Sequence, residues 1–179
     1  RQNLFISPKF PGKYTRNDKE EINMNHTKWL DKTVEMAIEN VRNGGGPFAA
    51  IVVKDGEIIG TGTNLVHVNN DPSAHAELLA IREACTALSS IDLSDCVLYA
   101  SGEPCPMCLG AAYWSAVGNI YYACSKSEAL EDANFENPLA AFFSDQTKEP
   151  ENREVPFIQV KTENCLAPFH EWNRKNSHA

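Results

Sequence analysis

The chain has 179 residues, a formal net charge of −8 and a sequence pI of about 5.1. This length fits one domain with a sizeable core, and the acidic balance disfavours a nucleic-acid partner, because phosphate contacts need clustered Lys and Arg. No apolar run approaches the ~18 residues of a membrane span, so no membrane association is expected.

Residues 1–24 are polar and predict an N-terminal extension ahead of a functional domain at residues 25–179. Hydrophobic periodicity and turn signals place the elements of that domain. In chain order we expect a helix at 25–43, strands at 47–54 and 57–65 around an Asp55-Gly56 turn, a helix at 74–88, a strand at 96–101, a helix at 104–115, a strand at 119–124, a short helix at 127–134, a loop at 142–153, a strand at 155–160 and a helix at 163–175. This order predicts an α/β fold with three layers, α/β/α, around a central mixed five-stranded sheet.

The runs His75-Ala76-Glu77 and Pro104-Cys105-Pro106-Met107-Cys108 together indicate one catalytic zinc site. His75, Cys105 and Cys108 supply an imidazole and two thiolates, and three protein ligands leave a fourth position open for water. Zinc lowers the pKa of such a water to about 7. Glu77 is then the expected catalytic base, which takes a proton from the water and later protonates the leaving amine.

The spacing of these residues favours two helix N-termini around the metal. Cys105 and Cys108 are three apart, so both sulfurs point the same way on a helical turn, and a helix N-terminus favours thiolates. His75 and Glu77 are two apart, which suits a helix start better than a helix interior. Asp71-Pro72-Ser73 offers capping residues just before them.

Two other interpretations of the cysteines remain open. A structural zinc site needs a fourth protein ligand, which one of the other cysteines can supply: Cys85, Cys96, Cys124 or Cys165. A thioredoxin-like redox pair explains Cys105 and Cys108 but gives His75 and Glu77 no role. The four remaining cysteines are scattered singly and are typical of free, buried thiols, so we expect a cytoplasmic protein in a reducing compartment.

The motifs also carry a family resemblance. From about residue 25 to 173 the chain resembles the cytidine-deaminase superfamily of zinc nucleobase deaminases, and within it the bacterial guanine deaminases. The matching runs are Gly45-Gly46-Pro47-Phe48, the eight residues 70–77, the nine residues 103–111, Pro168-Phe169 and Trp172. The resemblance implies Zn²⁺ as cofactor, a free nucleobase as substrate, and a homodimer, possibly with exchanged C-terminal segments.

The resemblance further implies which side chains contact the base. Asn64 matches the base-binding Asn of the family, and Phe48 and Trp114 match aromatic positions near the pocket. Ala76 and Asn137 complete the implied substrate contacts. From residue type alone, Phe48 and Trp114 equally suit ordinary core packing, and Asn64 equally suits a turn at a strand end.

The chain departs from the guanine-deaminase pattern at two places. Phe135-Glu136-Asn137 stands where the family has Phe-Asp-Asp, and a neutral Asn137 cannot mimic an ionised Asp facing two donors. The tail at residues 173–179 lacks the aromatic residue with which the family tends to close its pocket. A smaller departure is Gly102, where Cys is common.

Four functions follow from these observations. Hydrolytic deamination of guanine to xanthine and ammonia is the leading interpretation. The second keeps the chemistry and changes the substrate to a nucleoside, cytosine, isocytosine or another amino-heterocycle, as Asn137 and the tail suggest. A tRNA adenosine deaminase shares the metal motifs but conflicts with the acidic charge. A non-enzymatic zinc module requires a closed site with four protein ligands.

Overall fold

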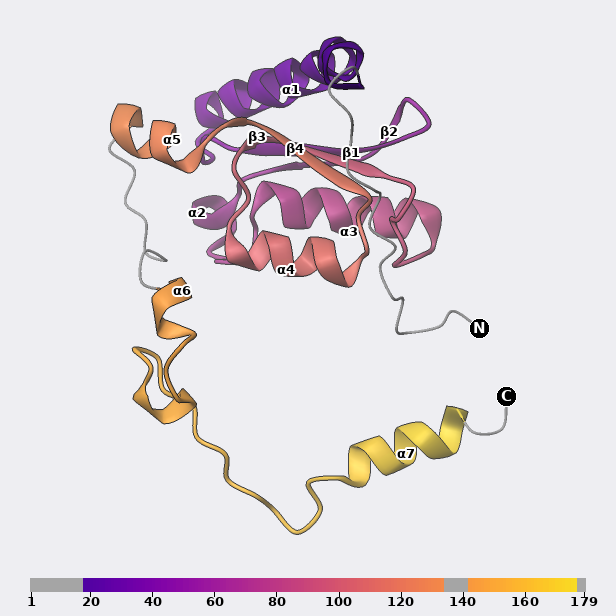
Figure 1. The fold of residues 1–179 in the computed structure, drawn as a ribbon, viewed down its shortest axis with the longest axis vertical. Coiled ribbons are helices and arrows are strands. Elements are labelled where there is room, and N and C mark those ends of the chain that lie inside the picture. The colour runs from indigo at the N-terminus through magenta and orange to yellow at the C-terminus, as the bar shows by residue number, and fades with distance from the viewer. Residues whose placement is uncertain (1–17, 134–141, 177–179) are drawn as a thin grey trace. The chain divides into compact units, whose positions relative to one another are not determined.

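The computed structural model describes residues 18–133 and 142–176, which belong to two compact units, residues 1–135 and residues 136–179 (Figure 1). Helix α1 (Asp18–Arg42) begins inside the region predicted as an extension, seven residues before the helix start expected at residue 25. The rest of that region lies outside the described residues. The division into an extension at 1–24 and a domain at 25–179 therefore stays a prediction.

A four-stranded mixed sheet forms the centre of the first unit. Its strands are β1 (Ala49–Lys54), β2 (Glu57–Thr63), β3 (Val97–Gly102) and β4 (Asn119–Cys124). Their order is β2-β1-β3-β4, with β1 antiparallel to both β2 and β3, and β3 parallel to β4. The predicted turn is confirmed: Asp55 and Gly56 have φ of 50° and 80°, as a two-residue hairpin with primed geometry requires.

Helices cover both faces of this sheet, which confirms the three-layer α/β/α arrangement (Figure 1). Helix α1 lies on one face, over a core of Ile51, Val53 and Tyr99. Helices α3 (Ala76–Leu88) and α4 (Pro106–Trp114) lie on the other face, over the larger core. Two shorter helices, α2 (Val66–Asn69) and α5 (Lys126–Ala133), follow β2 and β4. Within the described part of the first unit, α2 has no counterpart among the elements expected from the sequence.

Helix α3 lies unusually close to strand β2. A Cβ on Gly60 would lie 2.7 Å from the amide nitrogen of Ala84, and a Cβ on Gly62 would lie 2.7 Å from that of Ala80 and overlap the carbonyl oxygen of Ala76. Both glycines are buried, so the strand backbone itself forms the surface on which α3 rests. This contact fixes the height of α3 above the sheet.

The second unit holds short elements and corrects two expectations. Residues 142–153, expected to be a loop, contain α6 (Phe142–Asp145) and a 3₁₀ turn at Pro150–Asn152. The strand expected at 155–160 is wrong in the described structure, where the sheet has four strands and not five. The apolar pattern is present, but a strand also needs a neighbouring backbone ladder, and no strand pairs with this segment in the described part of the chain. Helix α7 (Ala167–Asn176) closes the unit. No helix among the described residues is long and apolar enough to cross a bilayer.

Candidate active site

Both halves of the predicted metal motif begin helices, as the spacing indicated. His75 is the N-cap residue of α3, and Cys105 is the N-cap residue of α4, with Pro106 at the first helical position. N-cap side chains commonly bond to the amides of their own helix, but neither His75 nor Cys105 makes such a bond. Their ligand atoms therefore point away from the helix ends and toward each other.

One part of the expected local structure is wrong. Asp71 and Ser73 do not cap α3, because the N-cap position is taken by His75. Instead the Asp71 carboxylate accepts hydrogen bonds from the amide and hydroxyl of Ser73, at 2.8 and 2.7 Å. The two residues form a self-contained turn that precedes the helix.

The three expected ligand atoms form a nearly equilateral triangle. The Cys105 and Cys108 sulfurs lie 3.5 Å apart, and His75 Nδ1 lies 3.6 Å from each sulfur. Tetrahedral zinc with bonds of about 2.3 Å to sulfur and 2.0 Å to nitrogen needs a sulfur–sulfur edge of about 3.8 Å and sulfur–nitrogen edges of about 3.5 Å. In the described part of the chain, this triangle contains no fourth His, Cys or carboxylate ligand. The residues present fit a metal ion that keeps one open position.

The ionisation of this cluster also suits a cation. The contact with the Cys108 thiol lowers the pKa of Cys105 to about 4, and the contact with His75 makes a smaller contribution in the same direction. The same pairing with Cys105, together with burial, raises the pKa of Cys108. The contact with Cys105 likewise raises the pKa of His75. The three groups thus share protons at a point where a cation can replace them.

Glu77 lies beside the ligand triangle without joining it. Its side chain is only 7% exposed, and burial raises its pKa above the ordinary value for a glutamate. The Glu77 carboxyl group and the Cys108 thiol are close enough for each to affect the pKa of the other. A buried carboxyl group with a raised pKa is suited to accept a proton and to return it near neutral pH.

The predicted substrate residues are distributed over several elements. Ala76, the first residue of α3, is buried, and Phe48 packs against the large core. Asn64 follows β2 and is 9% exposed, and its Oδ1 accepts a hydrogen bond from the Val66 amide at 3.3 Å. Asn64 therefore closes a local turn, while remaining a candidate for base contact.

Base contact by two further candidates stays a prediction. Trp114, at the last position of α4, is 76% exposed. Asn137 lies outside the described residues. The sequence analysis missed Asn40, a buried amide on α1 that is bonded to Asn64. Its signal was a polar residue on the apolar face of an amphipathic helix.

Comparison with known proteins places this site in a family. The family model described as MafB19-like deaminase matches residues 24–145, which include the metal triangle and Glu77. The chain belongs to the MafB19-like deaminase family. It is an aminohydrolase, and the resemblance to deaminases of the cytidine deaminase-like fold is confirmed.

The relatives include guanine deaminases. Guanine deaminase of Bacillus subtilis is 47% identical over 150 residues, which span 83% of this chain and 94% of that protein. Its crystal structure superposes with a TM-score of 0.77, at 45% identity, over 83% of this chain and 94% of that one. A structure of guanine deaminase from Nitrosomonas europaea matches 60% of this chain and 63% of that one, with a TM-score of 0.56 and 36% identity.

A tRNA deaminase matches a shorter part. The tRNA-specific adenosine deaminase of Aquifex aeolicus is 46% identical over 77 residues, which cover 43% of this chain and 51% of that protein. The shared stretch is thus about half as long as the one shared with the Bacillus subtilis protein.

Proposed function

We propose that this deaminase converts guanine to xanthine and ammonia, with Zn²⁺ held by His75, Cys105 and Cys108. The observation that carries the proposal is the triangle of one nitrogen and two sulfurs, with edges of 3.5 to 3.6 Å, beside a buried Glu77. The guanine deaminases of Bacillus subtilis and Nitrosomonas europaea support guanine as the substrate.

The chemistry divides between metal and protein. Zinc, when bound, supplies a hydroxide-like nucleophile near neutral pH. Glu77 takes one proton from the attacking water and gives it to the ring nitrogen beside the amino-bearing carbon. It then takes the remaining proton of the added hydroxyl group and gives it to the leaving amine. One water is consumed and one ammonia leaves, so the carboxyl group ends the cycle in its starting state. Burial of Glu77 suits this cycle, because it raises the pKa of the carboxyl group and so makes the carboxylate a stronger base.

Recognition of the base is assigned to Asn64, Phe48, Ala76, Trp114 and Asn137. The amide of Asn64 is a donor and an acceptor for the edge of the ring, and Phe48 offers an aromatic face. This assignment rests on the family resemblance and, for Asn64, on its placement where β2 leads toward the helix that bears His75 and Glu77.

The direct test is ultraviolet absorbance of guanine incubated with zinc-loaded protein. We expect conversion to xanthine, with one zinc per chain. Glu77→Gln should keep the metal and lower kcat by about 10² to 10⁴, the usual contribution of a general acid–base group. Undiminished turnover by this variant would refute the proton-transfer role, and absence of guanine turnover by the zinc-loaded wild type would refute the substrate.

One feature favours a second substrate within the same chemistry. Asn137 replaces the acidic residue that guanine deaminases use at this position, so a different amino-heterocycle is the alternative. A panel of guanosine, cytosine and isocytosine, followed by ammonia release, compares these substrates. Asn137→Asp should raise kcat/KM for guanine if residue 137 selects the base, and an unchanged ratio would remove it from that role.

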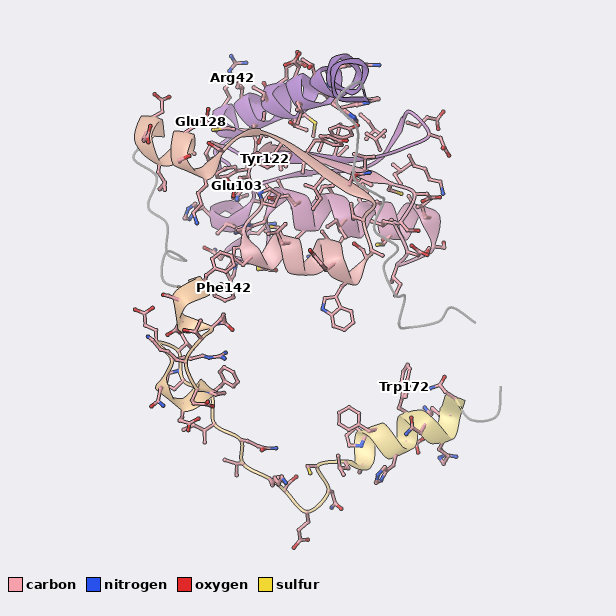
Figure 2. The ribbon with its side chains drawn as sticks, in the orientation of Figure 1. Arg42, Glu103, Tyr122, Glu128, Phe142 and Trp172 are labelled. Carbon is pink, nitrogen blue, oxygen red and sulfur yellow. The ribbon has the colours of Figure 1, made fainter. Side chains whose placement is uncertain are left out.

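We also propose a cytoplasmic homodimer with exchanged C-terminal segments, whose deaminase domain spans residues 25–179. Reduced thiols at Cys105 and Cys108 are needed for metal binding, which a reducing compartment preserves. The second unit exposes apolar side chains that a second copy of the chain would cover: Val155, Phe157, Ile158, Val160, Phe169 and Trp172, the last labelled in Figure 2. Sedimentation equilibrium should give twice the chain mass, and Phe169→Ser with Trp172→Ser should shift it toward the monomer.

A further inference from the structure

The side chain of Asn40, in the last turn of α1, is buried in a network of backbone groups. It is 7% exposed, and its Nδ2 donates two hydrogen bonds of 2.8 Å, to the carbonyl oxygens of Gly46 and Asn64. The backbone carbonyl oxygen of Asn40 accepts a hydrogen bond of 2.8 Å from the Gly45 amide. Asn40 therefore joins three segments: the end of α1, the glycine loop before β1, and the residue after β2.

The backbone of Asn64 is held from several sides in the same network. Its carbonyl oxygen also accepts a 3.0 Å bond from the Gly46 amide, and its amide donates a 2.9 Å bond to the Phe48 carbonyl. Its side-chain Oδ1 is engaged by the Val66 amide. The two residues assigned to the base, Phe48 and Asn64, thus share one hydrogen-bonded frame with Asn40.

This frame is packed without spare room around the Asn64 side chain. A Cβ on Gly46 would lie only 2.7 Å from Asn64 Oδ1 and 2.9 Å from its Cγ. The backbone of Gly46 therefore limits where the Asn64 side-chain amide can lie, since not even a Cβ fits between them. Asn40 bonds to the carbonyls of both residues and sets their separation.

We propose that Asn40 is a positioning residue that places the Asn64 amide for recognition of the base. The inference deepens the proposed function and rests on the assignment of Asn64 to the substrate. Asn40 acts through Asn64, since the hydrogen bonds of its side chain in the described structure go to the backbone carbonyls of residues 46 and 64. The amide is required because it donates two hydrogen bonds at short reach, whereas an aspartate of the same shape only accepts them.

The test compares the same substitution at two nearby asparagines, one in the last turn of α1 and one just after its end. Asn40→Asp turns two donors into a carboxylate that faces two carbonyl oxygens. Asn43→Asp is the matched control, because Asn43 is exposed and its side chain bonds only to Glu39, at 3.2 Å, among its described side-chain contacts. We expect Asn40→Asp to raise KM about tenfold, the size of one lost hydrogen bond, and to change kcat less than twofold. Asn43→Asp should change neither, and zinc content should be the same in both. Asn40→Ala removes the donors without adding a charge and should give the same KM effect. It replaces the aspartate variant if that protein folds poorly.

A double-mutant cycle separates positioning from general damage. In an Asn64→Ala background the Asn40→Asp change should alter KM less than twofold, because the group through which it acts is gone. An undiminished tenfold effect in that background, or a parallel loss of zinc, would overturn the proposal. The assay uses whichever amino-heterocycle the wild type turns over best, so failure of guanine as the substrate is distinguished from failure of this inference. Amide hydrogen exchange adds a readout without substrate: exchange at Gly46 and Asn64 should accelerate in Asn40→Asp and not in Asn43→Asp, and equal protection would refute the frame.

Discussion

Gly62→Ala is the substitution that tests whether the contact between β2 and α3 determines the geometry of the metal site. The added Cβ would overlap the Ala76 carbonyl oxygen and lie 2.7 Å from the Ala80 nitrogen. Both are backbone atoms of α3, so no side-chain rotation relieves the contact. The helix must lift from the strand by several tenths of an ångström or more, and His75 at its N-cap moves with it.

The magnitude follows from two opposing terms. Overpacking of a tight core costs about 1–3 kcal/mol, and a backbone-to-backbone contact belongs at the upper end. Replacement of a strand glycine returns about 0.5–1 kcal/mol through lower chain entropy in the unfolded state. A net loss of about 2 kcal/mol corresponds to a Tm lower by about 4–8 °C for a chain of this size. Displacement of one ligand in three should also weaken zinc binding about tenfold or more, within the range that misplaced supporting groups produce.

Differential scanning calorimetry and zinc competition with a chromophoric chelator measure the two effects. Gly110→Ala is the control, because the space around Gly110 is open to a Cβ and Gly110 lies on α4 beside Cys108. An alanine there should stabilise the helix by about 0.5–1 kcal/mol and leave zinc affinity unchanged. A Gly62→Ala protein with the wild-type Tm and the wild-type zinc affinity would refute the idea that this contact fixes α3.

Three further predictions test other parts of the structure. Cys108→Ser should lose zinc and activity together, which total metal analysis and the deamination rate measure on the same sample. Zinc retained at one per chain would remove Cys108 from the ligand set. Glu103→Ala should weaken zinc binding a few-fold, because the Glu103 carboxylate accepts a 2.9 Å hydrogen bond from the Lys126 amide and so holds the loop before Cys105 (Figure 2). Glu128→Ala is the control: it disturbs the cap of α5 and should leave zinc binding unchanged. Tyr99→Phe should lower the free energy of unfolding, measured in urea, by about 1 kcal/mol, because it removes the 2.7 Å hydrogen bond to His26. Its kcat/KM should stay unchanged, because this pair lies on the α1 face of the sheet, and a fall in kcat/KM would contradict that separation.

The places of the candidate metal ligands within their helices could be predicted because a helix start is determined locally. The positions of His75 and Cys105 at helix starts follow from their spacing, from Pro106 and from the needs of a thiolate, and the structure has both at N-caps. The capping role given to Asp71 and Ser73 failed for a related reason. Their residue types fit a cap, but an aspartate two residues before a serine also satisfies itself in a turn, and sequence does not choose between the two.

Features that depend on distant partners were beyond the sequence. The alternating segment at 155–160 has the composition of a strand, yet strand formation needs a second backbone whose position the segment does not encode. The sequence does not indicate the contact of Asn40, because its side chain bonds to Asn64, which is 24 positions away. The need for glycine at residue 62 likewise comes from its contact with α3, which the chain reaches after a further helix and turn.

This contrast between local and distant determinants has a consequence for how the substrate can change. The groups assigned to the chemistry, His75, Glu77, Cys105 and Cys108, begin two helices that rest on the sheet, so their geometry depends on core packing. Apart from Ala76, which lies on α3 between His75 and Glu77, the groups assigned to the base come from separate segments after β2, before β1, on α4 and beyond α5. Substitutions at those positions, such as the asparagine at 137, can therefore alter which ring is bound without moving the metal ligands. Substrate preference and metal affinity should accordingly vary independently among variants, except at residues such as Gly62 that support the helices themselves.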